Sequence, residues 1–266
     1  MDSQGTARKT ALVTGASSGI GRELARLLAA DRIDLVLVSR DAAALEALAR
    51  QLGAEYGVEA RAVARDLSEA HAASALWADL GGRAIDILVN NAGVGLYGPV
   101  HEQDPDALER MVQLNVVALT SLTRLALPAM IERRWGRVLN VGSLVGYQPE
   151  GPRMAGYYAS KAFVVSFSGS LARELAGTGV SVTALSPGPT ETSFERNSGA
   201  NRSNLFRFVP TMTAEAVAAA GYRGMKRQSA VVIPGFVAKA LAIGGRLPPR
   251  FVAAALNRFL LQEARR

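Results

Sequence analysis

The run Thr14-Gly15-Ala16-Ser17-Ser18-Gly19-Ile20-Gly21 is the stretch that decides the fold of this chain. It follows the apolar stretch Ala11-Leu12-Val13, which predicts a buried strand, and precedes residues 23–30, whose leucines share one face of a helix. A strand, a glycine turn and a helix N-terminus form an anion site, because free amides and the positive end of the helix dipole face the turn. We expect the pyrophosphate of a dinucleotide there.

Strand-like and helix-like stretches alternate along the 266 residues. The apolar pattern predicts strands at 9–13, 33–39, 59–64, 85–90, 137–141, 180–186 and 230–233, and helices at 19–30, 42–56, 68–81, 105–133, 155–176 and 214–227. This alternation predicts a single α/β domain over residues 1–266, in which helices cover both faces of a doubly wound parallel sheet.

Two segments depart from this alternation. Residues 187–213 show little regular pattern and contain Phe194, Phe206 and Phe208, so we expect a substrate lid at the edge where open α/β sheets bind ligands. Residues 236–266 predict a helical extension that covers the core or a subunit interface. The alternative for this extension is contact with a membrane surface.

Composition excludes several classes of protein. The chain has no cysteine, which removes disulfide and thiolate chemistry. The first ten residues are polar, and no uninterrupted apolar run approaches the ~18 residues of a membrane span. The formal charge of +7 is spread along the chain without interleaved aromatic residues, which favours a solvated surface over nucleic-acid binding. We therefore expect a cytoplasmic protein.

The end of the second predicted strand, Ser39-Arg40, indicates which dinucleotide binds. A fold that binds NAD usually places a carboxylate here for the ribose 2′-hydroxyl. A guanidinium suits a 2′-phosphate instead, so Arg40 favours NADP(H), while Asp41 is expected to begin the next helix.

Two further strand ends carry small or acidic residues. In Asp66-Leu67, the carboxylate is placed to accept a bond from the adenine amino group, or to cap the following helix. In Asn90-Asn91-Ala92-Gly93, the small side chains allow the backbone to approach a ribose, or form a simple turn.

Tyr157 and Lys161 lie four residues apart in a predicted helix and therefore share one face. A phenol is a poor proton donor at neutral pH, and a nearby ammonium lowers its pKa. Ser143 ends the fifth predicted strand and is placed to donate to a carbonyl oxygen as charge develops there, or to cap a turn. Asn115 is a polar amide in an apolar helix and is expected to hold a water that links Lys161 to solvent.

Other chemistries find no support in the sequence. Only His71 and His101 are present, and neither accompanies the glycine-flanked serine of a hydrolase elbow. No His, Asp or Glu cluster has metal-ligand spacing.

In their order and spacing, these motifs resemble the short-chain dehydrogenases/reductases over about residues 8–235. The resemblance is carried by residues 14–21, Asp66, Asn91-Ala92-Gly93, Asn115, Ser143, Tyr157-x-x-x-Lys161 and Pro187-Gly188. It implies a Rossmann-like sheet of seven strands and hydride transfer between a nicotinamide and a carbonyl or alcohol. Tyr157 would be the acid/base, Ser143 would orient the substrate oxygen, Lys161 would bind the ribose and lower the tyrosine pKa, and Asn115 would keep the proton relay.

The resemblance also implies cofactor contacts. Pyrophosphate and ribose would lie against Gly15, Ser17, Ser18, Gly19, Ile20 and Gly21, and the carboxamide and phosphate against Thr190 and Thr192. The chain departs from the family pattern in a longer interval between Ser143 and Tyr157, and in the ending Val231-Val232-Ile233-Pro234-Gly235.

These departures favour an NADPH-dependent reductase of a hydrophobic ketone or aldehyde. The alternative is a reductase of carrier-bound or coenzyme A-bound 3-oxoacyl groups, and a third class is a dinucleotide-binding regulator without turnover. We expect a homodimer or higher homo-oligomer, assembled through the helices that bear Asn115 and Tyr157.

Overall fold

The computed structural model describes residues 8–200, 203, 209–244 and 258–262. Within them, seven parallel strands form one sheet in the order β3-β2-β1-β4-β5-β6-β9. The strands are β1 (Thr10–Thr14), β2 (Asp34–Ser39), β3 (Ala60–Ala64), β4 (Ile87–Asn90), β5 (Gly136–Val141), β6 (Val180–Leu185) and β9 (Val231–Val232). The strand order reverses between β1 and β4, which is where sheets of this kind bind ligands. The predicted seven-stranded, Rossmann-like sheet is confirmed.

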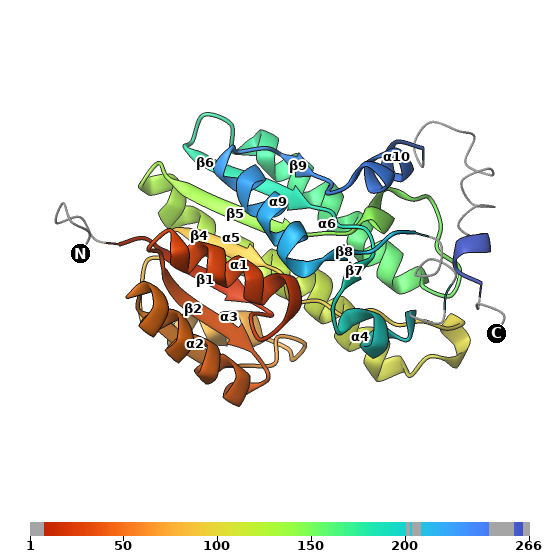
Figure 1. Ribbon diagram of the computed structural model, residues 1–266, viewed down its shortest axis with the longest axis horizontal. Coiled ribbons are helices and arrows are strands. Elements are labelled where there is room, and N and C mark those ends of the chain that lie inside the picture. The colour runs from red at the N-terminus through yellow and green to blue at the C-terminus, as the bar shows by residue number, and fades with distance from the viewer. Residues whose placement is uncertain (1–7, 201–202, 204–208, 245–257, 263–266) are drawn as a thin grey trace.

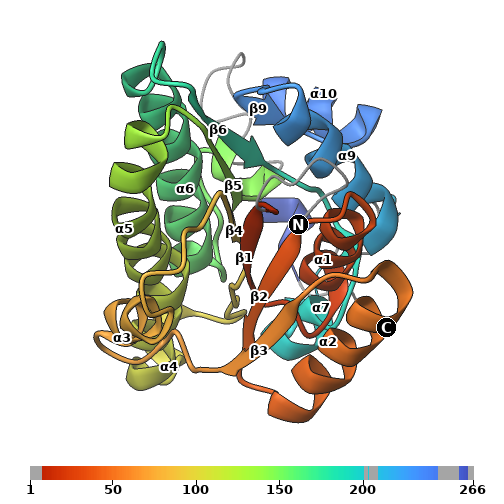
Figure 2. The ribbon, with the colours of Figure 1, turned by 90° about the vertical axis from the view of Figure 1, so that its left-hand side faces the viewer.

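Helices cover both faces of the sheet, as Figure 2 shows almost edge-on. One layer holds α1 (Gly19–Ala30), α2 (Ala42–Tyr56) and α9 (Ala214–Lys226), and the other holds α3 (Ala72–Asp79), α5 (Leu119–Glu132) and α6 (Ala155–Glu174). Side chains of a strand alternate between the two layers. Ala11 and Val13 of β1 accordingly pack into the first layer and Leu12 into the second.

The stretch predicted as one long helix is helical throughout, but it changes from α-helix to π-helix and back to α-helix. It consists of α4 (Pro105–Val112), the π-helical segment η2 (Gln113–Ala118) and α5. Asp104 accepts a hydrogen bond from the Asp106 amide and caps the start. Pro105–Glu132 has the length and hydropathy of a membrane-crossing helix, with a mean hydropathy of 1.5. Buried side chains such as Leu122 pack in the apolar layer beneath the sheet, as in the core helix of a globular domain.

Three sequence predictions need correction. The helix expected at 68–81 begins at Ala72, because Asp66 Oδ1 accepts bonds from the Ser68 amide and hydroxyl in a turn, and His71 takes a φ of +60°. The last strand covers only β9 of the expected 230–233. The lid expected to lack regular structure contains β7 (Thr190–Glu191), α7 (Phe194–Ser198) and β8 (Met212–Thr213). Phe206 and Phe208 lie outside the described residues.

The part of the chain that the structure describes also contains three other short helices (Figure 1). They are η1 (Val100–Glu102), η3 (Leu144–Tyr147) and α10 (Phe236–Gly244). Of the predicted extension 236–266, α10 and residues 258–262 are described.

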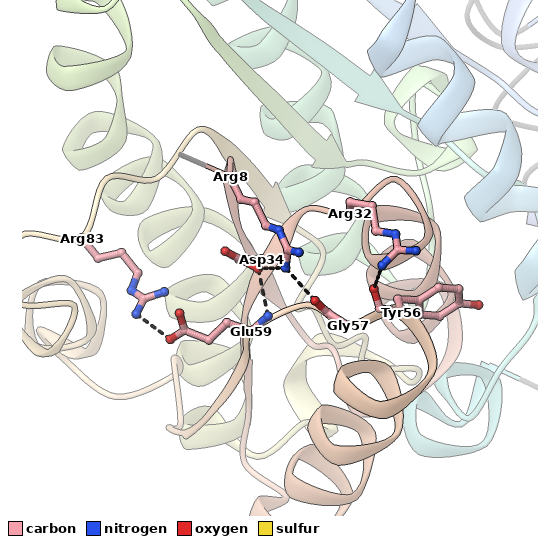
Figure 3. A network of polar contacts seen from close by, with 7 residues as sticks. All are labelled: Arg8, Arg32, Asp34, Tyr56, Gly57, Glu59 and Arg83. Carbon is pink, nitrogen blue, oxygen red and sulfur yellow. Dashed lines mark hydrogen bonds and ion pairs between the residues drawn. The ribbon is translucent and has the colours of Figure 1, made fainter. Parts of the chain in front are cut away.

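A polar network ties the amino ends of β1, β2 and β3 together (Figure 3). Arg8 Nη1 donates to Gly57 O at 2.6 Å and lies 3.7 Å from Asp34 Oδ1, which also accepts from the Glu59 amide at 2.9 Å. Arg83 Nη2 in turn donates to Glu59 Oε1 at 2.6 Å. Arg8 and Arg83 therefore have acidic partners, whereas Arg32 Nη1 donates to the backbone oxygen of Tyr56 at 2.6 Å.

Candidate active site

The glycine turn between β1 and α1 is held by the loop that follows β4. Asn91 Nδ2 donates to Thr14 O at 2.9 Å and Gly15 O at 3.1 Å, while Thr14 Oγ1 accepts from the Asn91 amide at 3.0 Å. Gly15 has a φ of +65°, and a Cβ on Gly21 would clash with Gly15 O and Asn91 Nδ2. The turn therefore requires these glycines, and Asn91 serves as its clamp.

One cavity of about 470 Å³ collects nearly all of the predicted site residues. Its lining includes Gly15, Ser17, Ser18, Gly19, Ile20, Ser39, Arg40, Asp66, Leu67, Asn91, Ala92, Gly93, Ser143, Tyr157, Lys161, Pro187, Gly188, Thr190 and Thr192. Gly21 and Asn115 are absent from the lining. Gly21 packs behind the glycine turn, and Asn115 lies behind Gly93.

At one end of the cavity, Arg40 and Asp66 come from the carboxyl ends of neighbouring strands. Arg40 Nη1 lies 3.8 Å from Asp66 Oδ2, and the Arg40 side chain is 73% exposed. Partial burial opposes ionisation of Asp66, but hydrogen bonds from Ser68 and the charge of Arg40 outweigh it and hold the pKa of this carboxyl below its usual value. Asp41 caps α2 by accepting from the Ala44 amide, as predicted, and it lines the cavity together with Arg40.

The segment after β6 closes over the glycine turn. A Cβ on Gly19 would lie 3.0 Å from Thr192 Cγ2, so Thr192 lies directly against the turn. Thr190 Oγ1 donates to Gly188 O at 3.0 Å and stabilises this segment. Within the described residues, the Ser18 side chain makes no cap bond to α1, which leaves the first amides of the helix for an anion. Together with Arg40, this cradle fits a dinucleotide that carries phosphate groups.

Tyr157, Ser143 and Lys161 meet in the central part of the cavity. A side-chain hydrogen bond joins Tyr157 and Ser143. Lys161 Nζ lies 5.9 Å from the centroid of the Tyr157 ring and donates to Val141 O at 2.8 Å. All three side chains are buried, because η3 and α6 pack against the carboxyl end of β5.

Burial dominates the electrostatics of this group. It raises the pKa of the Tyr157 phenol to about 12, although the hydrogen bond with Ser143 lowers it in part. Burial also lowers the pKa of the Lys161 ammonium to about 8. The expectation that Lys161 brings the phenol pKa towards neutrality is therefore not met by the groups of the chain alone, because desolvation outweighs a cation at this distance.

Asn115 occupies the π-helical segment and pairs with the loop after β4. Its Oδ1 accepts from the Val94 amide at 3.0 Å, and its Nδ2 donates to Val94 O at 2.9 Å and Ser160 Oγ at 3.0 Å. Ser160 Oγ donates to Tyr157 O at 2.8 Å, so this chain of bonds reaches the backbone of the tyrosine. Asn115 thus positions the loop and α6, in addition to the water and proton relay that the sequence predicts for it.

Apolar side chains also line the cavity, among them Val94, Leu114, Met154 and Phe194. Of these, the sequence indicated only Phe194, in the expected substrate lid, and its ring lies 5.3 Å from that of Tyr157. A Cβ on Gly95 would lie 2.8 Å from Phe194 Cζ, so the loop after β4 needs glycine to admit α7.

Leu261, close to the C-terminus, packs into the same apolar cluster. Leu261 is 1% exposed and belongs to the cluster that contains Tyr157 and Met154. Tyr97 Oη donates to Leu261 O at 2.6 Å, and the Tyr97 amide donates to Ser198 O at 3.0 Å. These contacts join segments far apart in the chain, so no local pattern could have indicated them.

Comparison with known proteins places this geometry in a family. A family model described as short chain dehydrogenase matches residues 9–203. A very-long-chain 3-oxoacyl-CoA reductase of Anas platyrhynchos is 36% identical over 182 residues, which cover 66% of this chain and 58% of the relative. The match thus spans less than two thirds of the length of that relative.

Two solved structures cover most of the chain. A short-chain dehydrogenase from Sphingobium yanoikuyae in complex with NADPH has a TM-score of 0.80 and 36% identity, covering 89% of this chain and 92% of its own. The bulky-bulky ketone specific alcohol dehydrogenase from Comamonas testosteroni has a TM-score of 0.77 and 32% identity, covering 88% and 90%. The protein described here belongs to the short-chain dehydrogenase/reductase family.

Proposed function

We propose that this protein reduces the carbonyl group of a hydrophobic ketone or aldehyde with NADPH. The observation that carries the proposal is that Tyr157, Ser143 and Lys161 meet in the same cavity as the glycine turn and Arg40. When bound, NADPH supplies a hydride for the carbonyl carbon. The carbonyl oxygen takes the Tyr157 proton, so that the products are an alcohol and NADP⁺.

Each side chain has a defined task in this reaction. A pKa of about 12 keeps the Tyr157 phenol protonated, which is the form that a proton donor needs. Ser143 donates to the same oxygen as negative charge develops there. The Lys161 ammonium, held by Val141 O, stabilises the phenolate left after proton transfer. Asn115 positions α6 through Ser160.

The preference for NADP(H) rests on Arg40. Its guanidinium lines the cavity at the carboxyl end of β2, next to an ionised Asp66 that suits an adenine amino group as acceptor. The Sphingobium yanoikuyae structure, which contains NADPH, supports the same assignment.

The hydrophobic substrate class rests on the apolar side chains that line the cavity. Val94, Leu114, Met154 and Phe194 offer apolar surface to a substrate, although Ser193, Asn197 and Ser198 also line the cavity. The Comamonas testosteroni enzyme, specific for bulky ketones, is a similar chain. The similarity to the Anas platyrhynchos reductase favours coenzyme A-bound or carrier-bound 3-oxoacyl groups as the second candidate.

A panel of substrates tests the proposal. NADPH oxidation is followed with bulky apolar ketones and aldehydes, with 3-oxoacyl thioesters and with buffer alone. Turnover of the apolar carbonyls supports the first candidate, and turnover of the thioesters alone supports the second. Tight NADPH binding without turnover of any carbonyl would show that the chain is a dinucleotide-binding regulator.

We also propose that the protein forms a homodimer through the helices around Asn115 and Tyr157. Val117 of η2 and Phe163 of α6 are exposed apolar residues on this side of the molecule, and the Phe163 ring stacks on Phe167 at 5.7 Å. Light scattering of the protein and of a Phe163→Asp variant tests this arrangement. A dimer that becomes a monomer supports it, and an unchanged mass contradicts it.

A further inference from the structure

The helix α10 leaves an apolar stripe open to solvent. Ala238 and Ala242, four residues apart, are buried in a cluster with Leu144 of η3. Phe236 and Ile243 are on the opposite side of the helix and are 87% and 58% exposed. Phe236 is the most exposed large apolar side chain among the residues that the structure describes. The inward face therefore covers the core as expected, whereas the outward face has no partner within the described chain.

The stripe lies beside the substrate end of the cavity. α10 packs against η3, the segment that follows Ser143, and Gln148 Nε2 donates to Leu241 O at 2.9 Å. Residues 258–262 lie at the same end of the molecule, to the right in Figure 1. There Phe259 is 51% exposed, two residues before the buried Leu261 that closes the Tyr157 cluster. Both described parts of the tail therefore flank the apolar part of the site.

The tail also carries most of the net charge of the protein. Residues 236–266 contain one acidic residue, Glu263, against the six basic residues Lys239, Arg246, Arg250, Arg258, Arg265 and Arg266. They account for five of the seven excess positive charges of the chain. In the polar network at the amino end of the sheet, Arg8 pairs with Asp34 and Arg83 with Glu59 (Figure 3), whereas the tail has one acidic residue for six basic residues.

This combination selects one kind of partner. Two copies of the tail repel each other, which disfavours a contact between identical tails. A nucleic acid would satisfy the charge but would leave the aliphatic and phenyl side chains exposed to water. A lipid surface with anionic headgroups satisfies both, because apolar side chains enter the acyl boundary while basic side chains remain among the headgroups.

We infer that α10 and residues 258–262 dock this protein on an anionic lipid surface through the outward face of α10 and through Phe259. Docking in this orientation places the apolar end of the cavity next to the bilayer. The docking itself does not depend on the reaction, and only the entry of a hydrophobic substrate from the lipid rests on the proposed function.

Cosedimentation of the full chain with vesicles tests this inference without any activity measurement. We expect at least about tenfold stronger binding to vesicles of phosphatidylglycerol and phosphatidylcholine in equal parts than to pure phosphatidylcholine. This binding weakens as the salt concentration rises from about 0.05 M to about 0.5 M, because the headgroup attraction is screened. The double variant Phe236→Ser/Ile243→Ser weakens it by at least about tenfold, because both side chains lose their burial in lipid.

Ile131→Ser provides the matched control. Ile131 is an exposed apolar residue at the end of α5, near the opposite end of the sheet, and its replacement should leave vesicle binding unchanged. Circular dichroism and light scattering confirm that each variant is folded and show its oligomeric state. The inference is overturned if the wild-type chain fails to sediment with anionic vesicles, or if the double variant binds them as well as the wild type does. It is also overturned if the double variant changes only the oligomeric state, since the stripe would then be a contact between copies.

Discussion

Replacing Arg40 by aspartate should change the cofactor preference of this protein selectively. The guanidinium is largely exposed, so its attraction to a 2′-phosphate is screened and amounts to about 1 kcal/mol per unit charge at about 4 Å. The substitution removes one positive charge and adds one negative charge beside a phosphate of about −1.5 to −2. The expected loss is about 3–4 kcal/mol, or a rise of about 150- to 900-fold in the Kd of NADPH.

The new carboxylate would also stand close to Asp66, which lies 3.8 Å from Arg40 in the native chain. A general disturbance of the adenine-binding part of the cavity would weaken NADPH and NADH equally. The ratio of the two Kd values therefore measures the contribution of Arg40 to binding of the 2′-phosphate. Both are measured by titration of the reduced nicotinamide fluorescence. Arg50→Asp is the control, because Arg50 is an exposed arginine of α2 outside the cavity lining and the change in net charge is the same. Equal rises for the two cofactors in Arg40→Asp would refute the reasoning.

The remaining predictions concern the turn, the buried lysine and the substrate end. Gly21→Ala should abolish measurable NADPH binding, because its Cβ would clash with the turn, and normal binding by this variant would contradict the prediction. In Gly169→Ala the Cβ meets open space in α6, so this control should raise the free energy of unfolding by about 0.5–1 kcal/mol. The Lys161 pKa of about 8 lies below its unfolded value of about 10.4, so the folded chain binds fewer protons between these values and this lysine destabilises it most below pH 8. The free energy of unfolding of Lys161→Met should therefore exceed that of the wild type by up to about 3 kcal/mol at pH 7, and this difference should shrink towards pH 10. A difference that does not depend on pH in denaturant titrations would disprove the assignment. Tyr97→Phe loses the hydrogen bond to Leu261 O and should raise the KM for an apolar ketone about fivefold without changing the Kd of NADPH. A change in both constants would contradict a role of Tyr97 that is confined to the substrate end.

Local features of this protein were predictable from its sequence. The glycine turn is recognisable in the sequence because a Cβ would clash with neighbouring atoms at both Gly15 and Gly21, and because glycine favours the φ of +65° at Gly15. The pairing of Tyr157 with Lys161 follows from helical spacing, and the strands follow from continuous apolar runs buried on both faces.

Features that depend on contacts between distant segments were not predictable. The hydrogen bonds of the Asn115 side chain to Val94, in the loop after β4, could not be read from the sequence. Tyr97 and Leu261 are 164 residues apart, and no periodic pattern records their hydrogen bond. The pKa of Tyr157 was expected to fall because of Lys161, whereas the extent of burial, which only the packed structure reveals, raises it.

The most direct test of the account is the rate of a single turnover in the Tyr157→Phe variant. NADPH-loaded protein is mixed with the best carbonyl of the panel, and the absorbance of the reduced nicotinamide is followed. We expect a rate about 10²- to 10⁴-fold below that of the wild type, with the Kd of NADPH unchanged, because only the proton donor is lost. An undiminished rate in the variant would contradict the assignment of Tyr157 as the group that protonates the substrate.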